Sequence, residues 1–192
     1  MKSKALSIII LFLLISCTKQ EKKPVHSLTQ TEKKIIKLYN RIGYVSNICP
    51  DSLGIYASQT ERLAATESIP FQAMALYYRG VYYQNSSSYQ LSNDHFEKSI
   101  KLLENAKHDT IKARNYIGIG NNLKNSGDYP KAFRYLYQAL RINEKYHRKY
   151  GISSSLGCLA QIHLQKNDIP AAKEYLLKAL KVLGDDKYNQ VY

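Results

Sequence analysis

Apolar residues recur at intervals of three and four positions along much of this chain. The segment 132–148 shows this most clearly, with Phe133, Leu136, Tyr137 and Leu140 on one side of a helix that has 3.6 residues per turn. Polar and charged residues fill the intervening positions. The spacing therefore predicts an amphipathic α-helix that buries one face.

Small residues and turn residues indicate how such helices are connected. Small residues stand where helices are expected to touch, at Gly120, Ala132, Ala139, Ala160, Ala172 and Ala179. They let helix axes approach closely, as antiparallel packing requires. Gly127 and Asn167 suit the left-handed residue that ends a helix, and Asp128 and Asp168 are natural N-caps for the next one. These features predict antiparallel helix pairs.

The pattern repeats with a period of forty residues. Its clearest copy spans 113–146, where Tyr116, Gly120, Ala132 and Leu136 hold ordered positions. Another copy follows in register, and weaker copies precede it over 76–100 and 33–72. The 113–146 segment resembles a tetratricopeptide repeat over its full length. This resemblance implies an all-α fold, a right-handed α-solenoid of antiparallel helix pairs with about four repeats over residues 33–192.

The first residues have the pattern of an export signal. Lys2 and Lys4 precede an apolar run that is too short to span a bilayer as a helix. The run ends in a small residue directly before Cys17, and this resembles a bacterial lipobox. The resemblance implies a lipoprotein signal peptide over 1–16, cleavage before Cys17 and its acylation. It also implies that residues 17–32 form a flexible tether and that the protein is a membrane-anchored lipoprotein of the bacterial cell envelope, expected to face the periplasm. A plain signal peptide with an incidental Cys17 is the alternative.

The formal net charge of +13 concerns partners and solubility more than fold. Many basic residues of 131–149 lie away from the apolar stripe, which predicts a solvated outer face. Export separates the chain from cytoplasmic nucleic acid, so no nucleic-acid partner is expected. Acidic protein segments and anionic envelope polymers stay open as ligands. Three cysteines cannot form a disulfide framework, and Cys49 and Cys158 are expected to be small buried apolar residues.

Candidate catalytic motifs have structural explanations. Gly118 and Gly120 resemble part of a dinucleotide fingerprint, but they fall inside a predicted helix with no strand before it. Ser153 lacks the strand–turn–helix setting of a nucleophilic serine. The histidines are scattered, and His163 occupies a position expected to be partly buried. The sequence therefore predicts neither a metal site nor a cofactor, and the protein is not expected to be an enzyme.

The family resemblance implies a concave groove, lined by the first helix of each repeat, that binds protein or peptide segments. Carried over by position, the groove residues are Tyr77, Tyr78, Arg114, Asn121, Lys124, Asn125, Gln161 and Gln165. Asn121 stands where relatives often use asparagine to bond a peptide backbone. Ile117 replaces a lysine of the chaperone-binding members, which argues against their carboxylate clamp. The expected function is an envelope scaffold that binds protein partners.

The C-terminal end leaves a second reading open. No polar capping helix is evident after the last repeat, and residues 187–192 resemble the opening of another first helix. The array is therefore expected either to meet a partner at this end or to belong to a longer chain. In the second case it is the extracytoplasmic sensor region of a truncated signalling protein, a histidine kinase or a DNA-binding regulator.

Overall fold

The computed structural model describes residues 27–45, 50–106 and 108–184, and within these ranges it contains eight α-helices and no strand. The helices are α2 (Gln30–Val45), α3 (Pro50–Ala64), α4 (Ile69–Asn85), α5 (Tyr89–Leu102), α6 (Asp109–Asn125), α7 (Tyr129–Lys145), α8 (Lys149–Gln165) and α9 (Ile169–Gly184). The first helices α4, α6 and α8 begin at 69, 109 and 149, and the second helices α5, α7 and α9 at 89, 129 and 169. The forty-residue period is confirmed.

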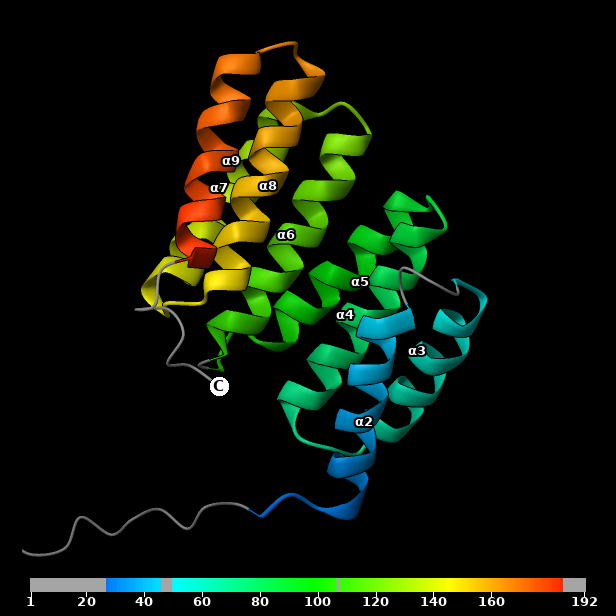
Figure 1. Cartoon of the computed structure of the whole chain (residues 1–192). Coiled ribbons are helices and arrows are strands. Elements are labelled where there is room, and N and C mark those ends of the chain that lie inside the picture. Colours follow the sequence, from blue (N-terminus) through cyan, green and yellow to red (C-terminus); the bar gives the residue numbers. More distant parts are fainter. Residues whose placement is uncertain (1–26, 46–49, 107, 185–192) are drawn as a thin grey trace, which may run out of the picture.

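Each helix packs against the next one in the chain, so the molecule is an all-α solenoid of helix pairs, as expected. The pairs stack in chain order from α2 and α3 at one end to α8 and α9 at the other (Figure 1). First helices also contact one another across repeats, α2 with α4, α4 with α6 and α6 with α8. Second helices of the described chain make no contact of similar extent with one another. The first helices therefore form the inner surface of the stack.

The N-terminus of α2 is closed by a capping box. The Thr29 backbone N–H donates to Glu32 Oε2 at 2.8 Å, and the Glu32 N–H donates to Thr29 Oγ1 at 3.0 Å. The packed helices thus begin at Gln30, a few residues before the expected start at position 33. Cys17 and the rest of the expected signal peptide lie outside the described residues.

The turns between helices follow the predicted chemistry. Gly127 has φ +81° and Asn167 has φ +59°, so both adopt the left-handed conformation. The N–H after each of them bonds back to the preceding helix, Asp128 to Leu123 O at 2.9 Å and Asp168 to His163 O at 2.8 Å. Both aspartates then cap the next helix, because Asp128 Oδ1 accepts from Lys131 N and Asp168 Oδ1 from Ala171 N.

The Phe96 side chain is fully buried between two first helices. Its ring faces Gly80 of α4 and Gly118 of α6, and a Cβ added at Gly80 would lie 2.5 Å from Phe96 Cε1. A methyl group at Gly118 would overlap the other edge of the ring. Because these two positions carry no side chain, α4 and α6 can both pack directly on the aromatic ring. Gly120 makes the same kind of contact with Leu136, so packing explains both glycines of the apparent nucleotide motif.

Two polar rungs join α4, α5 and α6 on either side of this ring. Ser92 Oγ donates to Gly80 O at 2.8 Å and accepts from Asn122 Nδ2 at 2.8 Å. Two helical turns away, Ser99 Oγ donates to Ala73 O at 2.8 Å and accepts from Asn115 Nδ2 at 2.9 Å. All four of these side chains are buried. The serine hydroxyls and amide nitrogens of the rungs all have partners, while Asn115 Oδ1 has none among the described residues. Since buried polar groups stabilise a fold when they are paired, these bonds fix the register of the three helices.

We predict that Gly118→Ala lowers the free energy of unfolding by about 1–3 kcal/mol, because the new methyl group overpacks against Phe96. Urea unfolding measures this change. Gly157→Ala is the matched control: it lies in helix α8 with no atom within 4 Å of an added Cβ, so improved helix propensity should stabilise it slightly.

A second substitution tests the mechanism of this loss. Phe96→Leu removes ring atoms from the contact, so Gly118→Ala should cost less in the Phe96→Leu background than in the wild type. Strictly additive costs in this double-mutant cycle would contradict the packing of Gly118 on the ring.

Candidate functional site

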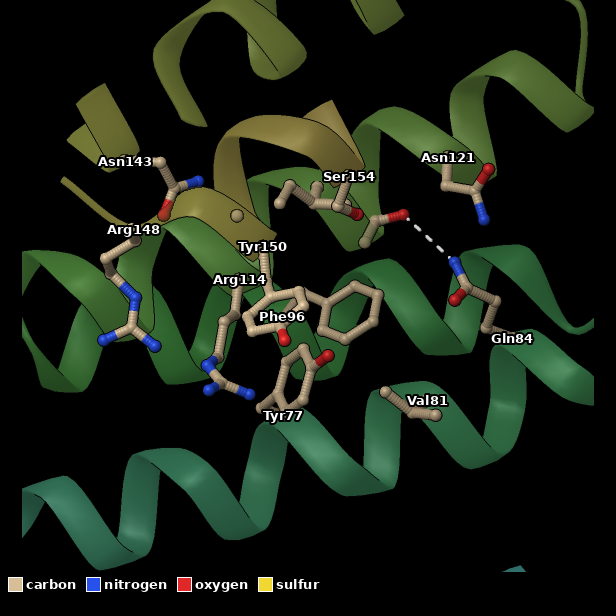
Figure 2. Close-up of a pocket in the computed structure, with 13 residues that line it drawn as sticks. Tyr77, Val81, Gln84, Phe96, Arg114, Asn121, Asn143, Arg148, Tyr150 and Ser154 are labelled. Carbon is tan, nitrogen blue, oxygen red and sulfur yellow. Dashed lines mark hydrogen bonds between the residues drawn. The ribbon is translucent and has the colours of Figure 1, made fainter. Parts of the chain in front are cut away.

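An open cavity of about 230 Å³ lies on the inner surface between α4, α6 and α8 (Figure 2). Its lining comes mainly from the first helices, with contributions from α5, α7 and the α7–α8 turn. The lining residues are Tyr77, Val81, Gln84, Phe96, Arg114, Ile117, Gly118, Asn121, Asn143, Arg148, Tyr150, Gly151 and Ser154. Three predicted groove residues, Tyr77, Arg114 and Asn121, meet here.

Helical spacing explains why these side chains converge. On α6, Arg114, Ile117 and Asn121 follow one another at steps of three and four residues and so share one face. On α4, Tyr77 and Val81 are likewise four residues apart. Each helix therefore presents one continuous stripe to the cavity, and the rigid packing of α4 and α6 on Phe96 fixes the separation of the stripes.

Tyr77 and Arg114 form a polar contact inside the cavity. Burial raises the pKa of the Tyr77 phenol, and the positive charge and side-chain hydrogen bond of Arg114 partly oppose that shift. The Tyr77 ring lies 5.7 Å from the Phe96 ring, measured between centroids. The phenol thus stays neutral at physiological pH and offers an aromatic face with a polar end.

Gln84 is held in place at another edge of the cavity. Its Nε2 donates to Gly118 O at 3.1 Å (Figure 2). The same nitrogen donates to Asn122 Oδ1 at 2.5 Å, so Gln84 bridges α4 and α6. Asn122 Nδ2 in turn donates to Ser92 Oγ and to Asn93 Oδ1, each at 2.8 Å. The buried polar network therefore reaches the cavity through Gln84.

The other predicted groove residues lie elsewhere on the inner surface. Lys124 is buried and its Nζ donates to Gln161 Oε1, which joins α6 to α8. Asn125 and Gln165 are exposed at the last positions of these two helices. The Lys124–Gln161 pair and the two helix ends thus extend the polar surface beyond the cavity.

Tyr78 faces the preceding repeat, away from the cavity. Its ring centroid lies 4.8 Å from that of Tyr39 on α2 and 5.1 Å from that of Tyr77. The Tyr39 hydroxyl donates to Phe71 O at 2.8 Å, which fastens α2 to α4. Burial is the main cause that raises the pKa of Tyr78, to about 12. Tyr78 therefore contributes to the junction between the first two repeats.

Sequence reasoning missed Asn143, Arg148, Tyr150 and Ser154 as cavity residues. One signal could have identified Asn143, because leucines stand forty residues before and after it, at Leu103 and Leu183. An asparagine at a position that other repeats give to leucine is a polar substitution in the core. The remaining three lie near the start of α8. The groove prediction used positions in the middle of first helices and therefore did not include them.

His163 and Cys158, two residues that the sequence predicts to be buried at least in part, both lie on α8. His163 is partly buried, as expected, and its Nδ1 lies 2.9 Å from Asp168 Oδ2. That hydrogen bond is the largest cause that lowers the pKa of Asp168. Cys158 is partly buried and burial raises the pKa of its thiol, while Cys49 lies outside the described residues. The described part of the chain contains no group of three or more potential metal ligands among His, Cys, Asp and Glu.

Residues 109–185 match the family model described as tetratricopeptide repeat. This match covers helices α6 to α9, and the preceding helices continue the same spacing and pairing. No curated protein matches the chain. None of the described helices combines the length and apolar character needed to cross a membrane. The match and the all-helical fold support a tetratricopeptide-repeat protein, and repeats of this kind typically serve as non-enzymatic scaffolds for protein interaction.

We predict that Tyr78→Phe reduces the loss of stability that the protein suffers between pH 9 and pH 11. A raised folded pKa means that Tyr78 stabilises the fold fully below its unfolded pKa of about 10 and that this contribution is lost as pH rises toward about 12. At pH 11 the difference is about 1 kcal/mol. Urea unfolding of both proteins at pH 7, 9 and 11 measures it, with pH 7 as the reference for packing effects. Parallel pH profiles would contradict the assignment.

Proposed function

We propose that this protein is a lipid-anchored tetratricopeptide-repeat scaffold of the bacterial cell envelope that binds a protein or peptide partner in its inner groove. The observation that carries the proposal is the cavity on the inner surface, where Tyr77, Arg114 and Asn121 converge from two adjacent first helices. Successive first helices contact one another, so this surface continues from repeat to repeat. A continuous surface of this kind suits an extended segment of a partner.

The chemistry of the groove fits a peptide. An amide side chain such as Asn121 both donates and accepts, so it can pair with a peptide backbone. Tyr77 adds an aromatic face, and aromatic and arginine side chains carry much of the energy at protein interfaces. Gln84 is already bonded to Gly118 O and Asn122, so ligand binding does not have to pay the entropy of ordering it.

The anchoring part of the proposal rests on the N-terminal sequence. Its basic start, its apolar run and the small residue before Cys17 are what export and lipid attachment require. Each acyl chain inserts many CH₂ groups at about 0.8 kcal/mol apiece, and two or more chains give stable attachment to a bilayer. The groove would then work at a membrane surface, where a tether of about a dozen residues between Cys17 and the Thr29–Glu32 capping box would leave it free to reach partners.

We predict that the partner contacts the inner surface. A photo-crosslinking amino acid at Asn121 should capture the partner in intact cells, whereas the same probe at Gln138, an exposed residue of second helix α7, should not. With the partner purified, Asn121→Ala should weaken binding about fivefold, the effect of one hydrogen bond, and Gln138→Ala should leave it unchanged. Crosslinking through Gln138 alone would place the binding surface on the second helices and refute the groove.

We predict that Cys17→Ser releases the protein from membranes, because serine cannot accept the thioether-linked lipid. Cell fractionation measures the release, and the intact mass of the wild-type protein extracted in detergent measures the acyl chains. Cys158→Ser is the matched control and should keep the protein on the membrane, since Cys158 is partly buried in α8. Undiminished membrane retention of Cys17→Ser would refute lipid anchoring at this residue.

A further inference from the structure

Asn143 is a buried amide whose nitrogen has no hydrogen-bond partner among the residues that the structure describes. The residue is 3% exposed, yet it lines the inner cavity. Leaving a buried donor unpaired destabilises the folded state, because the donor loses its hydrogen bonds to water without gaining a partner. Leucine occupies the corresponding position in the neighbouring repeats, at Leu103 and Leu183. The repeat therefore accepts an apolar side chain here, and Asn143 lowers the stability of the fold with a donor that no described residue satisfies.

The surroundings of Asn143 favour a negatively charged ligand. Arg148 lines the same end of the cavity, and Arg114 lies near Tyr77 in the same view (Figure 2). None of the described residues that line the cavity is an aspartate or glutamate. Helix α8 begins at Lys149, so the positive end of its dipole also faces this region. Arginine, an amide donor and a helix start all attract acceptor oxygens.

Gly151 makes room for the amide. A Cβ added at this position would overlap Oδ1 of Asn143, so the absence of a side chain lets Asn143 lie against the first turn of α8. The amide is thus held beside the helix start by packing. A donor fixed in this way loses little entropy when it bonds a ligand.

We propose that this end of the cavity is an anion-binding subsite that takes the carboxylate of an aspartate or glutamate side chain from the bound partner. The inference rests on the proposed function, since the acidic residue belongs to the segment that lies in the groove. Asn143 Nδ2–H donates to one carboxylate oxygen, and Arg148 and Arg114 supply the positive charge. The cavity, at about 230 Å³, is large enough for an acidic side chain and opens onto the surface that Asn121 and Tyr77 share.

Two short labelled peptides test the subsite, one of alternating alanine and glutamate and one with glutamine in place of every glutamate. Fluorescence anisotropy of each is measured against the full chain purified in detergent. We expect the glutamate peptide to bind at least tenfold more tightly than the glutamine peptide. Inorganic phosphate, titrated by calorimetry, is the third probe, because phosphate offers the same acceptor oxygens without a peptide.

Asn143→Leu is the decisive variant, because leucine matches asparagine in shape and is the residue of the neighbouring repeats. It should unfold at the same or a higher urea concentration, since it removes an unpaired buried donor. It should bind the glutamate peptide about tenfold more weakly. Arg148→Gln should weaken binding similarly, and Arg141→Gln, which removes the same charge from an exposed position of α7, should change it less than twofold.

Four outcomes would overturn the inference. Equal affinity for both peptides would show that the site ignores charge. An unchanged glutamate affinity in Asn143→Leu would show that the general +13 charge, and not the subsite, binds the peptide. Binding of phosphate that Asn143→Leu abolishes, without binding of the glutamate peptide, would assign the subsite to phosphate. If the natural partner still crosslinks through Asn121 and binds Asn143→Leu normally, the groove stands and the subsite falls.

Discussion

The contact of the Phe96 ring with Gly80 and Gly118 sets the geometry on which the inner surface depends. The large Phe96 ring leaves no room for a side chain at either position, which explains the glycines on both α4 and α6. Forty residues later Leu136 takes the place of Phe96 and again meets a glycine, Gly120, whereas the position that follows Gly118 by one period holds Cys158. The Phe96 ring occupies more of the interface than leucine does, so α6 has a glycine, Gly118, where α8 has a cysteine. The spacing of α4 and α6, and with it the cavity, follows from that exchange.

Buried polar groups divide into two kinds, and the difference separates architecture from function. The hydroxyls of Ser92 and Ser99 and the amide nitrogen of Asn122 all have partners, so they stabilise the stack and fix its register. Among the described residues two buried side-chain atoms have none, the amide oxygen of Asn115 and the amide nitrogen of Asn143. Asn115 is held in its rung by its bonded nitrogen, whereas the unpaired Asn143 donor belongs to a residue that lines a cavity. Local rules of folding are most often broken where a ligand completes the structure.

The sequence alone predicts the helix pairs, their forty-residue period and the turn residues, because these depend on local chemistry. Asp128 caps a helix and Gly127 adopts a left-handed conformation whatever the rest of the chain does. The grouping of groove residues is harder to predict, since neighbouring positions on a helix point about 100° apart. Tyr77 therefore reaches the cavity while Tyr78 packs on Tyr39. A prediction that considers only first helices cannot find cavity residues on second helices. Comparison of the repeats with one another does identify Asn143, because leucines stand forty residues before and after it.

With the proposed subsite, the strong positive charge of the chain would gain selectivity through a fixed donor. Exposed lysines attract any anion, but each exposed pair contributes little and salt screens it. Such charge speeds the approach of an acidic partner without choosing its register. The buried Asn143 amide, in a cavity that Arg114 and Arg148 also line, would act differently, because it would favour an acceptor oxygen at one place and disfavour an apolar group there. Partner recognition would then have two parts. Attraction by the charged surface would set the rate of encounter, and the hydrogen bond to Asn143 would set the register in which the partner binds.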